Sequence, residues 1–400
     1  MPRVSRPPRI VFVQTQAIAA GAQEISRLLG DGLSKIQRDG HPEFEIHHLF
    51  FYRISDVSDR WANVHFCIPE SPRGPISFLA FLWKLVRMVR SIEPDVLLTF
   101  QHYGNVFGAP AGRRAGVPVI IANHVSAPAT ISPLTRFIDK ALGLLGVYDV
   151  ITVNSNETWR NYHEYPERYA RRLVHVPHGF EDKSVDMGRQ EARAAFGLPT
   201  GVCLLGSVAR LHPLKQLDTA IAVLARRPSL HLALAGQGPD EQRLRAIAAD
   251  LGVSNRVHFV GDLTPQQVGM FLAGLNVFVF PSAAETFGLA AVEAAQAGVP
   301  VIANDLPVLH EVLTVDGESC ALFVNAHDVD DFAAKIDVVV GDHTKAARMI
   351  SLGRKLASRY SVDSMVQAYA GLIRQSLGTG ASLHAGRGAR PAAALRSSQR

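Results

Sequence analysis

The sequence predicts an α/β protein of two doubly wound, Rossmann-like domains that face each other across a cleft. With 400 residues, the chain has the length of two domains of ordinary size. Short apolar runs of strand length alternate with longer helical stretches along nearly all of it. A polar stretch at residues 180–195 contains no predicted strand and divides these elements into two groups. Such alternation is typical of parallel sheets covered by helices.

The composition argues against nucleic acid as a partner. Hydrophobic residues make up 47% of the chain, which is enough for two substantial cores. The formal net charge of +5 would fit a nucleic-acid partner, but residues 378–400 contain four arginines and no acid. The rest of the chain is therefore nearly neutral, and its charge gives no support for nucleic-acid binding.

The cysteines and the apolar runs indicate a cytoplasmic protein. Cys67, Cys203 and Cys320 are scattered, without CxxC or metal-binding spacing, and they fit a reducing compartment. No apolar run reaches membrane-spanning length, and residues 1–8 lack the apolar segment of a signal peptide. We expect a cytoplasmic location, with a peripheral position at the inner face of the membrane as an open alternative.

The first domain is expected to span residues 1–185 and to begin with a buried strand at 9–15, a small-residue loop and a helix at 22–37. This order would suit a dinucleotide site. However, no G-x-G-x-x-G loop is present, which argues against a nicotinamide or flavin enzyme. A second strand is expected at 44–51, and no element is predicted between it and about residue 74.

Residues 76–92 predict an amphipathic helix whose polar side carries Lys84, Arg87 and Arg90. One interpretation is a helix that packs on the sheet ahead of a strand at 95–100. The other is an interfacial helix that contacts anionic lipid, which would suit a lipid-linked acceptor. The sequence leaves both open.

Two histidines stand at predicted strand ends of the first domain. His124 follows the strand at 117–123, and His102 follows the strand at 95–100. In an open α/β sheet, a side chain at the carboxyl end of a strand points into the crevice where ligands bind. His124 is the stronger functional candidate and His102 the second. Further strands at 149–154 and 173–176 complete this domain.

The second domain, residues 195–360, opens with a strand at 202–209 that leads into Arg210 and Lys215. Two fixed cations at a strand end would stabilise a bound anion, most strongly one whose negative charge grows in a transition state. Arginine can hold two phosphate oxygens, whereas lysine acts as a point charge. Gly206 would let the backbone pass close to the phosphates.

The most informative stretch, residues 276–304, predicts a strand, a loop, a helix at 287–297 and another strand. The first turn of that helix leaves backbone N–H groups without internal partners. Those of Phe287, Gly288 and Leu289 form a natural anion site.

Two carboxylates bracket this anion site: Glu285 stands just before the helix, and Glu293 lies about a turn and a half inside it. Thr-Phe-Gly-Leu follows the first glutamate, and Ala297-Gly-Val-Pro-Val follows the second. This pattern resembles the E-x7-E signature of the retaining family-four glycosyltransferases (glycosyl transferases group 1), which have the two-Rossmann-domain GT-B fold. The resemblance implies that Glu285 contacts the donor sugar and that Glu293 contacts the ribose of the nucleotide.

The likeness extends over nearly the whole chain. The family has the same arginine and lysine in the loop that holds the donor diphosphate, here Arg210 and Lys215, and a histidine beside the donor sugar, here His124. A Gly-Gly pair near the donor phosphate is replaced by Ala20-Gly21, so only Gly21 carries over.

Other parts of the sequence resemble the family less specifically. A G-x-G-P turn at 236–239 and Phe259-Val260-Gly261 would border the nucleobase pocket, and Pro177-His178-Gly179 resembles the Pro-Asn-Gly that closes the first domain.

The resemblance implies metal-independent transfer of a sugar from a nucleotide-diphosphate sugar to a glycan or lipid-linked acceptor, with retention at the anomeric carbon. No cofactor is expected, and a UDP-sugar is favoured over a GDP-sugar as donor. The attack would come from the side of the leaving diphosphate. The expected catalytic residues are His124, Glu285, Arg210 and Lys215, and the expected donor-binding residues are Gly21, Gly206, Arg210, Lys215, Val260, Glu285, Phe287, Gly288, Leu289 and Glu293.

The end of the chain offers one false metal motif. Asp328-Val-Asp330 spells D-x-D, but its place before a predicted helix indicates a capped helix start rather than a metal site. A last helix at 362–376 resembles the family's return helix, so that residues 361–377 cross back to the first domain. The basic tail, residues 378–400, is expected to be disordered.

Two other functions stay open from the sequence. A nucleotide-sugar epimerase of the same fold would convert a donor without any acceptor, but it lacks the E-x7-E pattern. A non-catalytic sugar-nucleotide-binding protein would not need the two cations and both glutamates.

Overall fold

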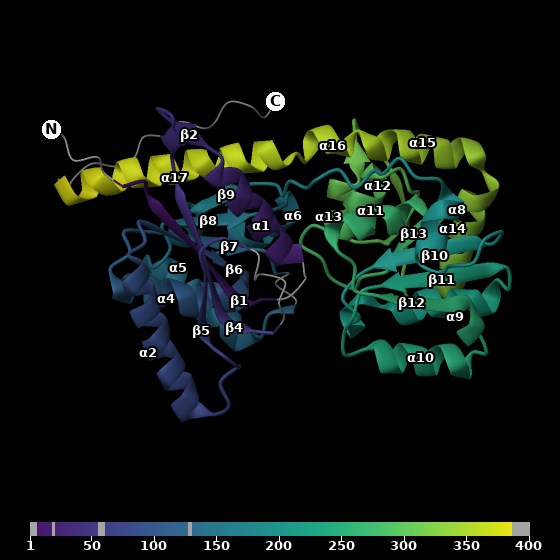
Figure 1. Cartoon of the computed structure of the whole chain (residues 1–400), viewed down its shortest axis with the longest axis horizontal. Coiled ribbons are helices and arrows are strands. Elements are labelled where there is room, and N and C mark those ends of the chain that lie inside the picture. Colours follow the sequence, from purple (N-terminus) through teal and green to yellow (C-terminus); the bar gives the residue numbers. More distant parts are fainter. Residues whose placement is uncertain (1–5, 18–20, 55–60, 127–129, 386–400) are drawn as a thin grey trace.

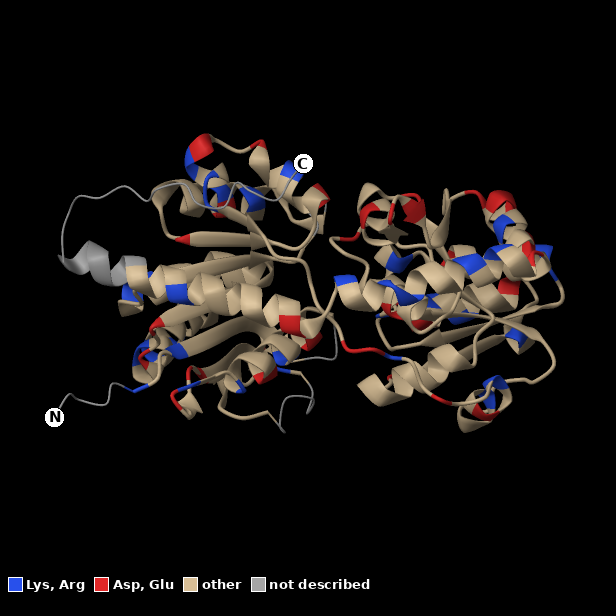
Figure 2. Ribbon diagram, turned by 90° about the horizontal axis from the view of Figure 1, so that it is seen from above, with Lys and Arg blue, Asp and Glu red and all other residues tan. Residues whose placement is uncertain are grey.

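The computed structural model describes residues 6–17, 21–54, 61–126 and 130–385, the last seven of these by their backbone only. Two parallel sheets, each covered by helices on both faces, lie side by side (Figure 1). The predicted fold class is thereby confirmed. Most of the charged residues lie on the helices and loops around the sheets (Figure 2).

The first sheet has seven strands, all parallel. β1 is fully buried from Ile10 to Val13, which explains its unbroken apolar sequence. The chain order reverses between β1 and β6, the switch point where ligands bind in such sheets. In spatial order the strands are β5 (Val64–Ile68), β4 (Glu45–Arg53), β1 (Arg9–Ala17), β6 (Val96–Phe100), β7 (Val119–His124), β8 (Val150–Val153) and β9 (Leu173–His175).

The second sheet has six parallel strands and a matching reversal between β10 and β13. Each of the two small hairpins in the described chain pairs two-residue strands: β2 (Gln37–Arg38) with β3 (His41–Pro42), and β15 (Thr314–Val315) with β16 (Glu318–Ser319). In spatial order the sheet strands are β12 (Val257–Gly261), β11 (Leu230–Ala235), β10 (Cys203–Val208), β13 (Val277–Phe280), β14 (Val301–Asn304) and β17 (Ala321–Val324).

Helices connect the strands in both halves. In the first half they are α1 (Gly21–Ser34), α2 (Pro75–Ile92), α3 (Gln101–Tyr103), the π-helix η1 (Gly104–Gly108), α4 (Ala109–Ala115), α5 (Pro133–Leu145), α6 (Asn156–His163) and α7 (Glu167–Ala170). In the second half they are α8 (Arg189–Ala195), η3 (Pro213–Lys215), α9 (Leu217–Arg226), α10 (Glu241–Asp250), η4 (Ser254–Arg256), α11 (Pro265–Ala273), α12 (Leu289–Gln296), α13 (Pro307–Val312), α14 (Val329–Gly341), α15 (His343–Arg354), α16 (Leu356–Arg359) and α17 (Val362–Ala385).

Two parts of the sequence prediction are wrong. β5 lies in the stretch before residue 74 for which no element was expected, because its partly exposed residues lack a continuous apolar run. The tail was expected to be disordered from residue 378, but α17 continues through Ala385. Its glycines there cost a helix only about 1 kcal/mol each, and no proline interrupts it. Residues 386–400 lie outside the described chain.

α17 returns from the second half of the chain to the first sheet. It packs against α1, and the Tyr369 hydroxyl donates a hydrogen bond of 3.2 Å to Thr152 Oγ1 in β8. All strands of the first sheet precede residue 180, and all strands of the second follow residue 195. The domain bounds expected from the sequence remain a prediction.

The two domains share one continuous apolar core. Where they meet, the ring of Phe287 lies edge-on to Phe180 and Tyr360, with centroids 5.6 and 5.1 Å away. A second contact is polar: the Glu311 carboxylate on α13 accepts hydrogen bonds from the amides of Asn156 (2.7 Å) and Glu157 (3.0 Å). The carboxylate thus caps the positive end of α6 from the other domain.

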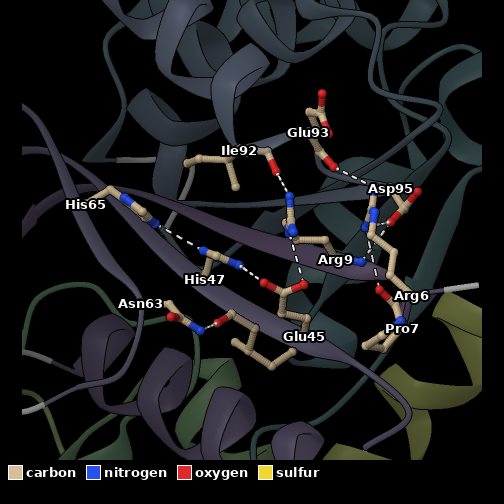
Figure 3. Close-up of polar contacts among 11 residues, drawn as sticks. Arg6, Pro7, Arg9, Glu45, His47, Asn63, His65, Ile92, Glu93 and Asp95 are labelled. Atoms are coloured by element: carbon tan, nitrogen blue, oxygen red, sulfur yellow. Dashed lines mark hydrogen bonds and ion pairs between the residues drawn. The ribbon is translucent and has the colours of Figure 1, made fainter.

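Arginines hold the carboxyl end of α2 at the amino edge of the first sheet (Figure 3). The Arg9 guanidinium donates to the Ile92 carbonyl and pairs with Glu45, 3.1 Å away. Arg6 donates to the Glu93 carbonyl at 3.1 Å. These cations satisfy carbonyls that a helix end leaves free, so α2 is fixed at this end.

Among the described residues, no helix is long and apolar enough to cross a membrane.

The domain junction has no space for a side chain at Gly179. A Cβ added there would lie 2.3 Å from the Ser361 carbonyl oxygen. We expect Gly179→Ala to lower the free energy of unfolding by about 1–3 kcal/mol, measured by urea denaturation. Gly188→Ala is the matched control, because a Cβ there has nothing within 4 Å and φ is −68°. Equal stability of the two variants would contradict the close contact.

Candidate functional site

The loop after β13 ends in a glycine that begins α12. Gly288 is the N-cap residue, with φ of 83°, and a Cβ there would lie 2.5 Å from Leu309 Cδ2. Both the left-handed backbone and the contact require glycine. The helix begins at Leu289, two residues later than expected, so its first turn exposes the amides of Leu289 and Ala290. The prediction that the Phe287 amide belongs to this turn is wrong.

The start of α1 touches the start of α12. Gly21 is the first residue of α1, and a Cβ there would lie 2.7 Å from Leu289 Cδ1. Two helix amino ends, one from each domain, therefore meet at the switch points of the two sheets. Each carries a partial positive charge, and together they favour an anion between them. Ala20 lies outside the described residues.

Lys215 and Glu285 form a direct ion pair. Lys215 Nζ lies 2.6 Å from Glu285 Oε1, and the ammonium also lies 5.4 Å from the centre of the Phe280 ring. The Ala283 amide donates to the Leu214 carbonyl at 2.8 Å, which joins the two loops through their backbones. Two residues that the sequence predicted separately are thus brought together.

Arg210 is exposed, and the described residues include no ion-pair partner for it. The backbone on either side of it packs against the Gly-x-Gly turn. A Cβ at Gly236 would lie 2.1 Å from the Ala209 carbonyl oxygen, and one at Gly238 would lie 2.1 Å from that of Leu211. These glycines therefore hold the arginine loop in place, a role that the sequence analysis missed. The Gly-x-Gly spacing of Gly236 and Gly238 was the sequence feature that could have indicated this role.

Glu293 lies in the second turn of α12 with its carboxyl group in poor contact with water. Burial raises its pKa to about 7; the Lys183 ammonium opposes this, and the carboxylates of Glu24 and Glu181 add to it. A carboxyl group with this pKa changes protonation near neutral pH. Above that pH it carries a negative charge that its burial disfavours.

His124 ends β7, as predicted, but it is buried and turned toward its own domain. Its Nε2 lies 3.1 Å from the Tyr169 hydroxyl, which donates to Asp139 Oδ2 at 2.8 Å. Nε2 therefore carries the proton, and Nδ1 remains an acceptor. Burial lowers the pKa of His124, and Asp139 opposes this. The Tyr148 hydroxyl is a second donor to Asp139, at 3.0 Å.

Thr286 ties the Glu285 loop to the first domain. Its hydroxyl donates to the Val125 carbonyl at 3.3 Å and accepts from Asn154 Nδ2 at 3.2 Å. Asn154 Nδ2 also lies 2.8 Å from His178 Nε2, and burial lowers the pKa of His178 to about 3. This chain of polar groups joins two strand ends, the domain boundary and the site loop. Sequence reasoning missed Thr286 and Asn154.

Two predicted donor residues occupy structural positions. Gly206 lies inside β10, and a Cβ there would lie 2.4 Å from Leu275 Cδ2, so its lack of a side chain serves packing. The expectation that it lets the backbone approach phosphates remains a prediction. Val260 lies in β12, and the residue after it, Gly261, accepts a hydrogen bond of 2.7 Å from the Gly236 amide. The role of Val260 remains a prediction.

The D-x-D motif caps a helix, as expected. Asp328 is the N-cap residue of α14, and its carboxylate accepts from the amides of Asp330 (3.1 Å) and Asp331 (2.9 Å). In the described part of the chain, no three His, Cys, Asp or Glu side chains are grouped so that they could hold a metal ion. The second histidine candidate, His102, does not contact Lys215 or Glu285. Its Nδ1 lies 3.3 Å from Ser126 Oγ.

Comparison with known families gives two adjoining matches. The profile of the glycosyl transferases group 1 matches residues 188–356, and that of glycosyltransferase family 4 matches residues 37–184. The D-inositol 3-phosphate glycosyltransferase of Acidothermus cellulolyticus is 30% identical over 329 residues, which are 76% of this chain and 72% of that protein.

Solved structures show the same fold at lower identity. HepE of Anabaena, crystallised with UDP and glucose, is similar with a TM-score of 0.79 and 19% identity, covering 91% of this chain and 99% of that one. Sucrose-phosphate synthase of Thermosynechococcus elongatus gives a TM-score of 0.78 at 20% identity, covering 93% and 100%. At these identities the likeness concerns the fold alone.

The raised pKa of Glu293 predicts a dependence of stability on pH. Because the folded pKa, about 7, exceeds the ordinary 4.5, stability is greatest at low pH and is lost as pH rises between these values. Glu293→Gln should therefore raise the free energy of unfolding near pH 8 by on the order of 2–3 kcal/mol, and by much less near pH 5. Urea denaturation at both pH values measures this. A gain of equal size at both would contradict the buried charge.

Proposed function

Because this chain belongs to the glycosyl transferases group 1 of glycosyltransferase family 4, whose members move a sugar from a nucleotide sugar, we propose that it transfers a hexosyl group from a UDP-sugar to a hydroxyl of a glycan or lipid-linked acceptor. The chain is a retaining enzyme of the GT-B fold; in the proposed reaction no metal ion takes part. One observation carries the proposal: Lys215, Glu285 and the amino ends of two helices meet at one place.

The diphosphate of the donor binds where positive charge gathers. The first amides of α12 and the start of α1 face it as fixed dipoles, and Lys215 and the exposed Arg210 supply full charges. As the bond between the anomeric carbon and the diphosphate oxygen breaks, negative charge grows on that oxygen. Preorganised cations stabilise this charge more in the transition state than in the bound donor.

The sugar and the ribose bind through carboxylates. Glu285 accepts hydrogen bonds from donor-sugar hydroxyls, and its existing pair with Lys215 places the sugar directly beside the diphosphate. Glu293, further along α12, accepts from the ribose. A ribose hydroxyl would supply a partner for a carboxylate that burial otherwise disfavours.

The acceptor hydroxyl attacks on the face of the leaving diphosphate. A new bond forms between the acceptor oxygen and the anomeric carbon while the bond to the diphosphate breaks, and the hydroxyl proton passes to a diphosphate oxygen. His124 orients the sugar: its Nε2 is held by Tyr169, and Nδ1 has no hydrogen bond with any described residue, so it can accept one from the sugar. Closure of the domains excludes water.

The nucleotide is identified first by thermal shift with UDP, GDP and ADP. A ligand at about 100 times its Kd stabilises the native state by roughly 2.7 kcal/mol. We expect a shift with UDP that Glu293→Ala reduces, because the ribose contact is lost. No shift with any of the three would refute the donor site, and an unchanged shift in the variant would remove Glu293 from it.

Loss of the Lys215 ammonium should slow transfer. We expect Lys215→Ala to lower kcat/KM by about 10²–10³-fold, because transition-state charge on the diphosphate is no longer stabilised. Lys355→Ala is the control, since that lysine pairs with Asp316 at the surface, 3.3 Å away. Donor turnover is followed with and without acceptors: conversion without any acceptor would indicate an epimerase instead, and near-normal turnover of the Lys215 variant would contradict its role.

A further inference from the structure

α5 differs from an ordinary surface helix in which of its side chains are buried and which are exposed. The residues that it buries fully are Asp139 and Gly143, and Leu142 and Leu144 are partly buried against the core, while its other large apolar side chains point outward. Leu134, Phe137 and Leu145 are 68%, 70% and 74% exposed. A helix normally buries such side chains in its own domain. This helix instead packs through Asp139, Gly143 and two partly buried leucines, and it leaves Leu134, Phe137 and Leu145 uncovered.

The start of α2 shows the same property. Ile76 is 84% exposed and Leu79 is 65% exposed, and Trp83 on the next turn is also exposed. The helix buries Phe81 and Leu85 further along. Its carboxyl end is fixed by arginines (Figure 3), and in Figure 1 its first turns extend beyond the rest of the first domain.

The two exposed faces are joined by η1. Phe78 of α2 lies edge-on to Phe107, with ring centroids 5.3 Å apart, and Phe107 stacks on Tyr103 at 5.9 Å. α5 packs against η1 as well. We use the term outer apolar face for a set of exposed apolar side chains on α2, α5 and α3: Ile76, Leu79, Trp83, Leu134, Phe137, Leu145 and Tyr103. A group of exposed apolar side chains of this kind on the surface of a domain indicates an interaction site.

On α2 and α5 themselves, the exposed charges have one sign. Residues 75–92 contain no acid and carry Lys84, Arg87 and Arg90. On α5 the single carboxylate, Asp139, is buried and accepts hydrogen bonds from two tyrosines, while Arg136 and Lys140 remain as cations. A surface that is apolar at its centre and basic at its margin matches an anionic bilayer, in which apolar side chains enter the acyl boundary and cations stay at the headgroups.

We propose that the outer apolar face docks the first domain on an anionic lipid bilayer. α5 follows β7, the strand that His124 ends, and so begins at the carboxyl edge of the sheet. In a parallel sheet, the helix before a strand also begins at that edge, which places the start of α2 there. Docking therefore brings the ligand-binding edge close to the membrane. Docking itself does not depend on the proposed reaction.

Sedimentation of the full chain with vesicles tests this. We expect binding to mixed phosphatidylglycerol and phosphatidylcholine vesicles at low salt, and weak binding to phosphatidylcholine alone. The double variants Leu134→Ser with Phe137→Ser, and Ile76→Ser with Leu79→Ser, should each weaken binding at least about tenfold. Val338→Ser with Val340→Ser, at exposed positions of α14 in the second domain, is the matched control and should bind as the original protein does.

A charge variant and two readouts separate the outcomes. Lys84→Glu with Arg87→Glu should lower binding and flatten its salt dependence. Thermal stability and the nucleotide-induced shift should stay unchanged in all these variants, so failure of docking is distinguishable from failure of the donor site. The proposal is overturned if no vesicle binds, if the apolar variants bind normally, or if neutral vesicles bind equally. It is also overturned if the chain dimerises through this face, with the same substitutions dissolving the dimer.

Discussion

The contact between the first residues of α12 and the first domain is the constraint on which the candidate site depends. Leu289 lies against Gly21, and Thr286 bonds to the strand ends of the other sheet. Glu285 directly precedes Thr286 in the loop before α12 and in turn holds Lys215. Neither sheet alone places these groups. The site is a joint product of both domains, so its geometry follows the angle at which they meet.

The sequence was sufficient for everything that local chemistry determines. Apolar runs identified both sheets, and their polar flanks indicated Arg210, Lys215 and Glu285 as separate candidates, of which the structure brings Lys215 and Glu285 together. The D-x-D motif was correctly assigned to a helix cap, because a carboxylate just before a helix can accept hydrogen bonds from the free amides of its first turn. His124 was placed correctly at its strand end.

What the sequence could not supply are contacts between distant segments. Nothing local indicates that Thr286 bonds to Val125, or that His124 faces Asp139. A glycine shows that a side chain is absent, but not which neighbour uses the space, and the contact between Gly206 and Leu275 was therefore not predicted. The sequence analysis assigned no element to residues 133–145, and the exposed apolar side of α5 could not be predicted, since burial is a property of the assembled domain.

Asp139 has two structural roles, and they limit how this enzyme can be re-engineered. The same carboxylate fixes α5 to its domain and, through Tyr169, sets the hydrogen bonding of His124. The outer helix is therefore not an interchangeable module. A graft that replaces α5 in order to change what the first domain meets has to carry Asp139, Tyr148 and Tyr169 as one unit, and Gly143 with them, because a Cβ there would lie 2.3 Å from the Tyr169 ring.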